Sequence, residues 1–250
     1  MRYLQLLLVF TFFTLSAAYS QRFVGSAILG MNATQVDGDN VYGFHKFGIN
    51  GGGSVTFAFN EKQTWFGTIE LLYTQKGSYR RSLVDSMKKP ANVDDRFPYN
   101  RKIKYKLVLD YVEVPVVVHY EDPKTGWSFG AGFAWGRLVN IKEIENGYRL
   151  NTNMQSHKIY KTSDWSVLAD VKFRLYKGLK LNFRYQYTFV PIRTRTFYYN
   201  TGETLVRKQY NHMLTLRLVY SFNEKFREND KVNRRGERVG PKWVRDISRY

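Results

Sequence analysis

The feature that most constrains this chain is an alternation near its C-terminal end, in which every second residue is apolar and most of the residues between them are polar. The apolar members Leu214, Leu216, Leu218, Tyr220 and Phe222 alternate with Thr215, Arg217, Val219 and Ser221. A period of two residues is that of a β-strand, because successive side chains of a strand point to opposite faces. The segment is therefore predicted to be a strand with one continuous apolar face.

Seven further segments fit the same period. They come in pairs, with short turns inside each pair and longer polar loops between the pairs. The eight predicted strands span residues 23–33, 47–59, 65–77, 103–120, 127–141, 165–176, 181–192 and 210–222. After the first 20 residues, no uninterrupted apolar run approaches the length of a membrane-spanning helix, whereas a transmembrane barrel strand needs only about 9 to 11 residues.

Alternation alone fits two kinds of barrel. In a soluble, lipocalin-like binding protein the apolar face forms the core, and in an outer-membrane barrel it meets lipid while the polar face fills the lumen. Large aromatic residues near the strand ends favour the membrane arrangement, since such residues form girdles at membrane interfaces. These residues are Trp65, Tyr73, Trp127, Trp135, Trp165, Tyr220 and Phe222.

The opposite face carries glycine and charges of both signs, which a narrow barrel can pair in its interior. The expected lumen charge network consists of Glu70, Glu113, Asp170, Lys172, Arg174, Arg184 and Arg217. We predict an all-β fold, namely an eight-stranded antiparallel up-and-down transmembrane β-barrel with short periplasmic turns and longer external loops. The network is interpreted as structural, because unpaired buried charge is costly; a proton or ion path is the alternative.

The stretch YVEVPVVVHY at 111–120 places a charge inside a valine run. The prediction is that Glu113 points into the lumen, where Arg174, Arg184 or Arg217 neutralises it. Pro115 removes a ladder hydrogen bond, which predicts a bulge or local distortion there. Upstream, Leu107 and Leu109 occupy odd-numbered positions and suggest a phase change of the strand at that bulge.

The N-terminus has the pattern of a secretory signal peptide. Arg2 precedes an apolar run from Leu4 to Leu15, and small residues lead to an expected cleavage near Ser20–Gln21. The chain has no cysteine, which excludes a lipid-modified N-terminal cysteine, disulfides and thiolate metal sites. The predicted organisation is a signal peptide at 1–20, a barrel at 21–222 and a basic periplasmic C-terminal tail at 223–250.

Three stretches resemble a known family. They are GFHKFGINGGGSVTFAF at 43–59, ELLYTQKGS at 70–78 and YVEVPVVVHY at 111–120, and they are similar to the PorT-type outer-membrane β-barrel proteins of Bacteroidota. The resemblance implies an eight-stranded barrel in the outer membrane of a Gram-negative bacterium. The PorT name is also used for a component of type IX secretion and gliding, which implies a link to protein transport.

An even number of strands places both termini on the periplasmic side. The tail contains nine Lys/Arg and five Asp/Glu residues, and it is interpreted as a docking segment for a periplasmic or outer-membrane protein. The candidate docking residues are Arg234, Arg235, Lys242, Trp243, Val244 and Arg245. The alternatives are a disordered solubilising tail and a flap over the barrel mouth.

The predicted external loop at 80–106 is strongly basic, with nine Lys/Arg and three Asp residues. Basic side chains at this level can contact the phosphates of lipopolysaccharide. The candidate contacts are Arg80, Arg81, Lys88, Lys89, Arg101 and Lys102. A solvated loop without a ligand is the alternative, and the predicted location argues against nucleic acid.

Enzymatic and metal-binding readings find little support in the sequence. Asp37 and Asp39 flank a glycine, but two carboxylates are too few for a calcium site and an ordinary turn is favoured. Ser78 or Ser82 could in principle meet one of the histidines, although no fixed catalytic spacing is present. The histidines are His45, His119, His157 and His212. We predict no enzyme activity, cofactor or metal.

The preferred functional hypothesis is a non-enzymatic outer-membrane barrel that serves as an accessory or scaffold subunit of an envelope secretion or assembly machine of the type IX kind. It would dock through its tail and loops and contact outer-membrane lipid and lipopolysaccharide. The alternatives are a stand-alone barrel for envelope integrity or surface adhesion, and the soluble lipocalin-like binder.

Overall fold

The computed structural model describes most of the chain between residues 23 and 222. The described residues are 23–39, 43–60, 64–84, 102–122, 125–145, 148–150, 159–176, 178–198 and 204–222. The predicted signal peptide at 1–20 and the predicted tail at 223–250 lie outside them. No helix in the described ranges is long and apolar enough to cross a membrane.

The described residues form ten β-strands. In chain order these are β1 (Val24–Asp37), β2 (Lys46–Ala58), β3 (Trp65–Val84), β4 (Lys102–Glu121), β5 (Trp127–Glu145), β6 (Tyr148–Arg149), β7 (Ser163–Tyr176), β8 (Leu179–Thr188), β9 (Arg193–Tyr198) and β10 (Thr204–Ser221). Eight of them form the barrel wall, because β6 pairs only with β5 and β9 only with β10.

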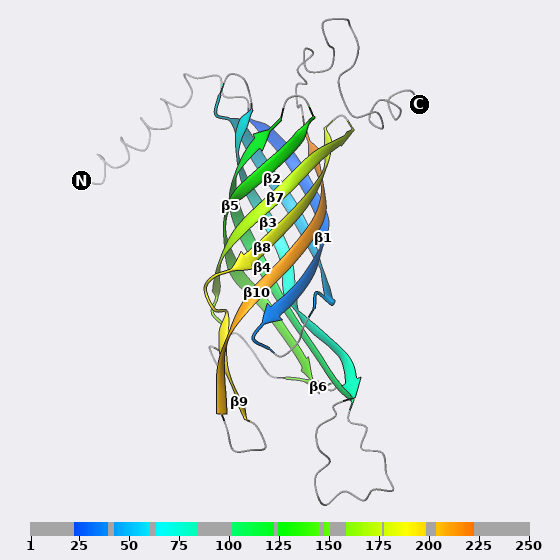
Figure 1. Ribbon diagram of the computed structural model, residues 1–250, viewed down its shortest axis with the longest axis vertical. Helices are drawn as coiled ribbons and strands as arrows, with labels where there is room; N and C mark the ends of the chain where they lie inside the picture. Colours follow the sequence, from blue (N-terminus) through cyan, green and yellow to red (C-terminus); the bar gives the residue numbers. More distant parts are fainter. Residues whose placement is uncertain are drawn as a thin grey trace, which may run out of the picture.

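The wall strands pair in sequence order as neighbouring antiparallel strands, and β10 pairs back onto β1 (Figure 1). In this closing pair Gly30 lies opposite Arg217 and Asp37 opposite Tyr210. Closure leaves no free edge in the wall and satisfies the backbone groups that a lipid environment cannot. The predicted eight-stranded antiparallel barrel is therefore confirmed.

The two ends of the barrel differ. At the end we call the turn end, the strands are joined by the short connections 59–64, 122–126 and 177–178, and here β1 begins and β10 ends. At the opposite end, the loop end, β10 extends beyond β1 and forms a hairpin with β9 (Figure 1). This hairpin occupies residues that alternation left between two predicted strands, so the sequence prediction missed it.

The surface of the wall is apolar and its interior is charged. Leu29 is 72% exposed and Phe133 63% exposed, whereas Glu70, Arg184 and Arg217 are each 1% exposed. This is the reverse of a soluble barrel, in which the charged face meets water. The lipocalin-like alternative is therefore wrong.

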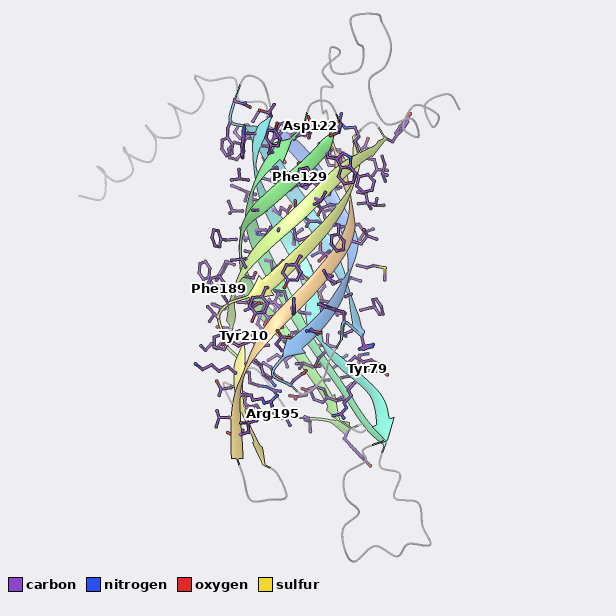
Figure 2. All side chains as sticks on the ribbon, viewed as in Figure 1. Tyr79, Asp122, Phe129, Phe189, Arg195 and Tyr210 are labelled. Carbon is purple, nitrogen blue, oxygen red and sulfur yellow. The ribbon has the colours of Figure 1, made fainter. Side chains whose placement is uncertain are left out.

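The aromatic residues predicted to form girdles all lie on the outer surface. Each is between 37% and 52% exposed: Trp65, Tyr73, Trp127, Trp135, Trp165, Tyr220 and Phe222. Several make ring contacts near the turn end, such as Trp65 with Tyr120 at 5.2 Å between centroids. Figure 2 shows Phe129 in the same region, and Arg195 at the opposite end of the molecule.

The predicted phase change in the fourth strand is wrong. Leu107 and Leu109 are both fully buried. Like Glu113 they occupy odd-numbered positions that point inward, so the strand does not change phase between them. The bulge lies instead in the neighbouring strand β5, where Leu138 pairs with Tyr111 and Asn140 with Asp110, leaving Val139 without a partner. Inward positions of β5 are even-numbered before Val139 and odd-numbered after it.

Pro115 causes a gap in the ladder and no change of register. It pairs with Ala134 on the β5 side. On the β3 side, Ile69 lies opposite Val116, and the next paired residues are Leu72 and Glu113. The ladder resumes in the same register, as expected when the missing N–H of proline removes one hydrogen bond locally.

Candidate functional site

The lumen on the turn side is filled by four charged side chains, which we call the arginine cluster: Glu70, Asp170, Arg184 and Arg217. Arg184 and Arg217 each donate two hydrogen bonds of 2.9 Å to the carboxylate of Glu70, one to each oxygen. Arg184 also donates to Asp170 Oδ2 at 2.6 Å. Parallel, two-point bonds of this kind fix both guanidinium planes.

His119 and Lys172 extend the arginine cluster. His119 Nε2 lies 2.9 Å from Asp170 Oδ1 and its Nδ1 lies 3.3 Å from Thr68 Oγ1. Lys172 is buried beside the same carboxylates, close enough to Asp170 and Glu70 for Coulomb attraction. The sequence placed His119 near a turn and did not assign it to the lumen.

Gly130 of β5 makes room for this arrangement. A Cβ atom at position 130 would lie 2.3 Å from His119 Cδ2 and 2.7 Å from Asp170 Oδ1, which is closer than real contacts allow. The glycine at position 130 is thus explained by the imidazole of His119, which occupies the inner space beside it.

Further toward the loop end, a second set of buried charges forms the lysine cluster: Lys76, Glu113 and Asp164. Lys76 Nζ lies 2.6 Å from Glu113 Oε1 and 2.8 Å from Asp164 Oδ2. Thr188 and Asn211 also donate to Asp164, at 2.7 and 2.9 Å. All three charged side chains are at most 1% exposed.

The predicted neutralisation of Glu113 by an arginine is therefore wrong. The two lumen-facing arginines of the central region bond to Glu70 instead, and Arg174 lies at the turn-end mouth. There its Nη2 is 3.6 Å from Glu121 Oε1, and Lys180 Nζ is 3.3 Å from Glu121 Oε2.

Lys76 and Asp164 were missed by sequence reasoning. Lys76 shares the parity of Glu70 on the third strand, and that parity was a usable signal. Asp164 precedes the predicted start of its strand.

Beyond the lysine cluster, the interior becomes apolar. This outer core consists of Val36, Tyr105, Leu107, Leu109, Tyr111, Leu138, Ile141, Tyr160 and Ile192. Its residues come from β1, β4, β5 and the segments that precede β7 and β9. These side chains pack against one another and fill part of the loop-end half of the barrel.

A polar cap covers the outer core, built from Arg193, Glu143, Tyr105 and Tyr160. Arg193 Nη1 lies 3.3 Å from Glu143 Oε1 and also donates to the Tyr160 hydroxyl, while Arg193 Nε donates to Gln209 Oε1 at 2.7 Å. Tyr105 donates to Glu143 Oε1 at 2.6 Å. Burial raises the pKa of the Tyr160 hydroxyl, so this group stays protonated and can donate to Glu143 Oε2. The bonds tie β5, β9 and β10 together outside the wall.

The remaining acidic, histidine and serine candidates in the described ranges are not gathered into one group. No group of three or more His, Asp or Glu side chains there is arranged to hold a metal ion. Asp37 accepts a hydrogen bond of 2.8 Å from Gln35 and lies 3.7 Å from His212 Nδ1. Ser78 is fully buried, with no hydrogen-bond partner for its hydroxyl in the described structure.

Most of the other predicted contact residues fall outside the described structure. Lys88, Lys89 and Arg101 lie in the range 85–101, and the side chains of Arg81 and Lys102 are likewise not described. Arg80 is half-buried on β3. The candidate docking residues Arg234, Arg235, Lys242, Trp243, Val244 and Arg245 all lie in the range 223–250.

Comparison with known proteins agrees with this architecture. One similar solved structure is Ail, the attachment invasion locus protein of Yersinia pestis, with 13% identity and a TM-score of 0.41 over 80% of this chain and 99% of Ail. A second is Neisserial surface protein A, with 13% identity and a TM-score of 0.39 over 80% of this chain and 96% of that protein. A third is a major outer membrane protein of Thermus thermophilus, with 10% identity and a TM-score of 0.42 over 82% of this chain and 100% of that protein. Likenesses at identities and TM-scores this low carry no inference about function. No curated protein matches the sequence. The family model described as outer membrane protein beta-barrel domain matches residues 19–193, which is more than half of the chain, and the protein therefore belongs to this family of outer-membrane β-barrels.

Proposed function

We propose that this chain is a non-enzymatic, non-conducting outer-membrane barrel that anchors a folded loop-end head at the cell surface, in support of envelope integrity or adhesion. The head consists of the outer core, the polar cap and the β9–β10 hairpin. In this arrangement the turn end and both termini face the periplasm. The proposal is supported by one observation above all, which is that the lumen is occupied along its length by the arginine cluster, the lysine cluster and the outer core.

Occupation of the lumen argues against a transport role. Buried ion pairs with several hydrogen bonds are costly to break, because each partner would be left as an unpaired charge that water does not solvate. An eight-stranded barrel has an interior just wide enough for side chains. A resting pore through these clusters would require their separation, so the useful surface is the outside of the molecule.

Conductance in planar lipid bilayers tests the proposal. The purified barrel should give no steady channel current, and neither should the variant Leu216→Ala, which changes only the lipid face. The double variant Arg184→Ala/Arg217→Ala removes bulk from the arginine cluster and serves as a sensitised control. Steady single-channel currents from the wild-type barrel at moderate voltage would refute the non-conducting role.

A second role is proposed on the resemblance to PorT-type proteins of Bacteroidota, namely a scaffold subunit of a type IX-like secretion machine. Its support is the basic tail, in which Trp243 and Val244 offer apolar anchors beside Arg234, Arg235, Lys242 and Arg245. Affinity purification from the native envelope, with and without residues 223–250, tests it. Partners that depend on the tail would favour this role, and an unchanged set of partners would favour the stand-alone barrel.

A further inference from the structure

Four of the basic side chains on the outer surface of the loop end lie on or beside β4 and β5, and none of these four has a counter-ion in the described structure. They are Lys106 on β4, Arg137 and Lys142 on β5, and Lys161 just before β7, and each is exposed. No described carboxylate lies within ion-pair distance of any of them, whereas the arginines of the lumen are held by Glu70 and Asp170.

Three of these cations lie in one column beyond a tryptophan pair. Trp135 of β5 lies directly opposite Trp165 of β7, and Arg137 is the next outward residue of β5, opposite Ser163. Lys161 is adjacent along the chain to Thr162, whose carbonyl accepts a hydrogen bond of 2.8 Å from the Leu138 N–H. Lys161 therefore lies beside the same stretch of β5 as Arg137.

The bulge at Val139 adds Lys142 to this column. Inward positions change from even to odd at the bulge, so Glu143 turns inward to Arg193 and Lys142 turns outward. Without the bulge, Lys142 would point into the outer core. The bulge thus places the carboxylate of Glu143 inside the barrel and the ammonium group of Lys142 on the outer surface.

One outward carboxylate of the neighbouring strand β4 forms no ion pair with these cations in the described structure. Asp110 of β4 pairs with Asn140 and is only 7% exposed. Its two oxygens already accept hydrogen bonds from Gln75 Nε2 at 3.0 Å and from Asn140 Nδ2 at 2.8 Å. Asp110 is therefore occupied by neutral amides and makes no ion pair with the column in the described structure.

The turn end lacks such a surface in the described residues. Its cations Arg174 and Lys180 occupy inward positions and lie near Glu121. The outer surface there is aromatic, with residues such as Trp127 and Tyr220. Among the described residues, the outward positive charge of the wall thus lies at the loop end, beyond the apolar band, at the level where lipid phosphates are expected.

We propose that Arg137, Lys142 and Lys161 form a binding site for the phosphate groups of lipopolysaccharide, with Trp135 and Trp165 packing against the apolar part of the same molecule. Guanidinium and ammonium groups bind phosphate through charge-assisted hydrogen bonds. The site rests on the proposed function for its orientation, because the loop end must face the outer leaflet. A lipopolysaccharide molecule bound at this site would lie against the outer surface of the barrel wall in the outer leaflet.

The test measures binding of purified lipopolysaccharide to the full-length barrel in neutral-lipid nanodiscs. The wild type should bind phosphorylated lipopolysaccharide at least about tenfold more tightly than enzymatically dephosphorylated lipopolysaccharide, since each basic residue near an anionic surface contributes about 1 kcal/mol. The variant Arg137→Gln/Lys142→Gln/Lys161→Gln should lose this preference. The matched variant Lys208→Gln, which removes an exposed loop-end cation from β10, should keep it.

Heat-modifiable migration of each variant checks that the barrel remains folded. Equal affinity of the triple variant and the wild type for phosphorylated lipopolysaccharide would overturn the site. If the wild type bound vesicles of phosphatidylglycerol as tightly as it binds phosphorylated lipopolysaccharide, the assignment to lipopolysaccharide would be overturned. Failure of this test is distinguishable from failure of the non-conducting role, because bilayer conductance does not depend on these outward residues.

Discussion

The ammonium group of Lys76 lies 2.6 Å from Glu113 Oε1 inside the barrel, and both side chains are 1% exposed. The two residues lie on adjacent strands, and the same ammonium reaches Asp164 on β7. One cation thus holds two carboxylates on different strands, which makes Lys76 a central link across the lumen.

Replacement of Lys76 by Met should destabilise the barrel by about 3–5 kcal/mol, because Glu113 and Asp164 would be left buried without their cation. The measurement is equilibrium unfolding by urea in lipid vesicles. Adding Glu113→Gln to Lys76→Met should recover part of the loss, with a coupling energy of about 0.5–3 kcal/mol. Strictly additive effects of the two substitutions would contradict the ion pair.

Glu70→Gln should be similarly costly, with a loss of about 3–5 kcal/mol, because Arg184 and Arg217 share this one carboxylate. The matched control is Glu121→Gln at the turn-end mouth, where the partly exposed pairs with Arg174 and Lys180 should contribute only about 0–1 kcal/mol. The same unfolding experiment compares the two variants. Equal stability losses would indicate that the arginine cluster is solvated.

Gly130→Ala should weaken the contact between His119 and Asp170, because the new Cβ would lie 2.3 Å from His119 Cδ2. The expected cost is about 1–3 kcal/mol, as for other overpacked interiors. Gly53→Ala is the control, since a Cβ there meets nothing nearer than Ser26 O at 3.5 Å. The imidazole NMR signals of His119 should move in the first variant and stay unchanged in the second.

Leu216→Arg should destabilise the barrel in lipid by about 2–4 kcal/mol, the cost of a cation on the lipid face near the bilayer midplane. Val206→Arg is a matched control on the same strand and the same parity, placed in the hairpin beyond the wall. It should change stability by less than about 0.5 kcal/mol, as other surface substitutions do. A comparable loss for both variants would mean that the hairpin also lies in the membrane.

Arg193→Met should loosen the head and leave the wall intact. The substitution removes the cation that joins Glu143, Tyr160 and Gln209, so backbone amides of β9 and the first part of β10 should exchange faster with deuterium. Amides of β7 and β8 in the wall should keep their protection. Unchanged exchange in the hairpin would show that the polar cap does not hold it.

The sequence predicted the strands and their faces because both depend on local periodicity. The outward Val112 and Val116 and the inward Glu113 follow directly from alternation. The partner of Glu113 did not follow, because pairing across a lumen depends on how the closed barrel is staggered, and no local pattern records the stagger. Parity could still have identified Lys76 as a lumen residue.

The head was harder to predict for a different reason. The hairpin partners Arg195 and Arg207 lie in basic, turn-rich sequence that resembles a loop. The bulge was assigned to the fourth strand on the evidence of Leu107 and Leu109, since the sequence of a membrane barrel gives no reason to expect leucines inside. They are inside because they belong to the outer core, an apolar cluster in the loop-end half of the barrel.

The unpaired Val139 has a consequence for changes of chain length. Deleting this one residue would exchange the inner and outer positions from 140 to 145 and would leave residues 127–138 as they are. Glu143 would then face outward and Lys142 would face the outer core. Insertions and deletions in this part of β5 should therefore be tolerated only when they add or remove an even number of residues. Natural length differences here are expected to be multiples of two residues.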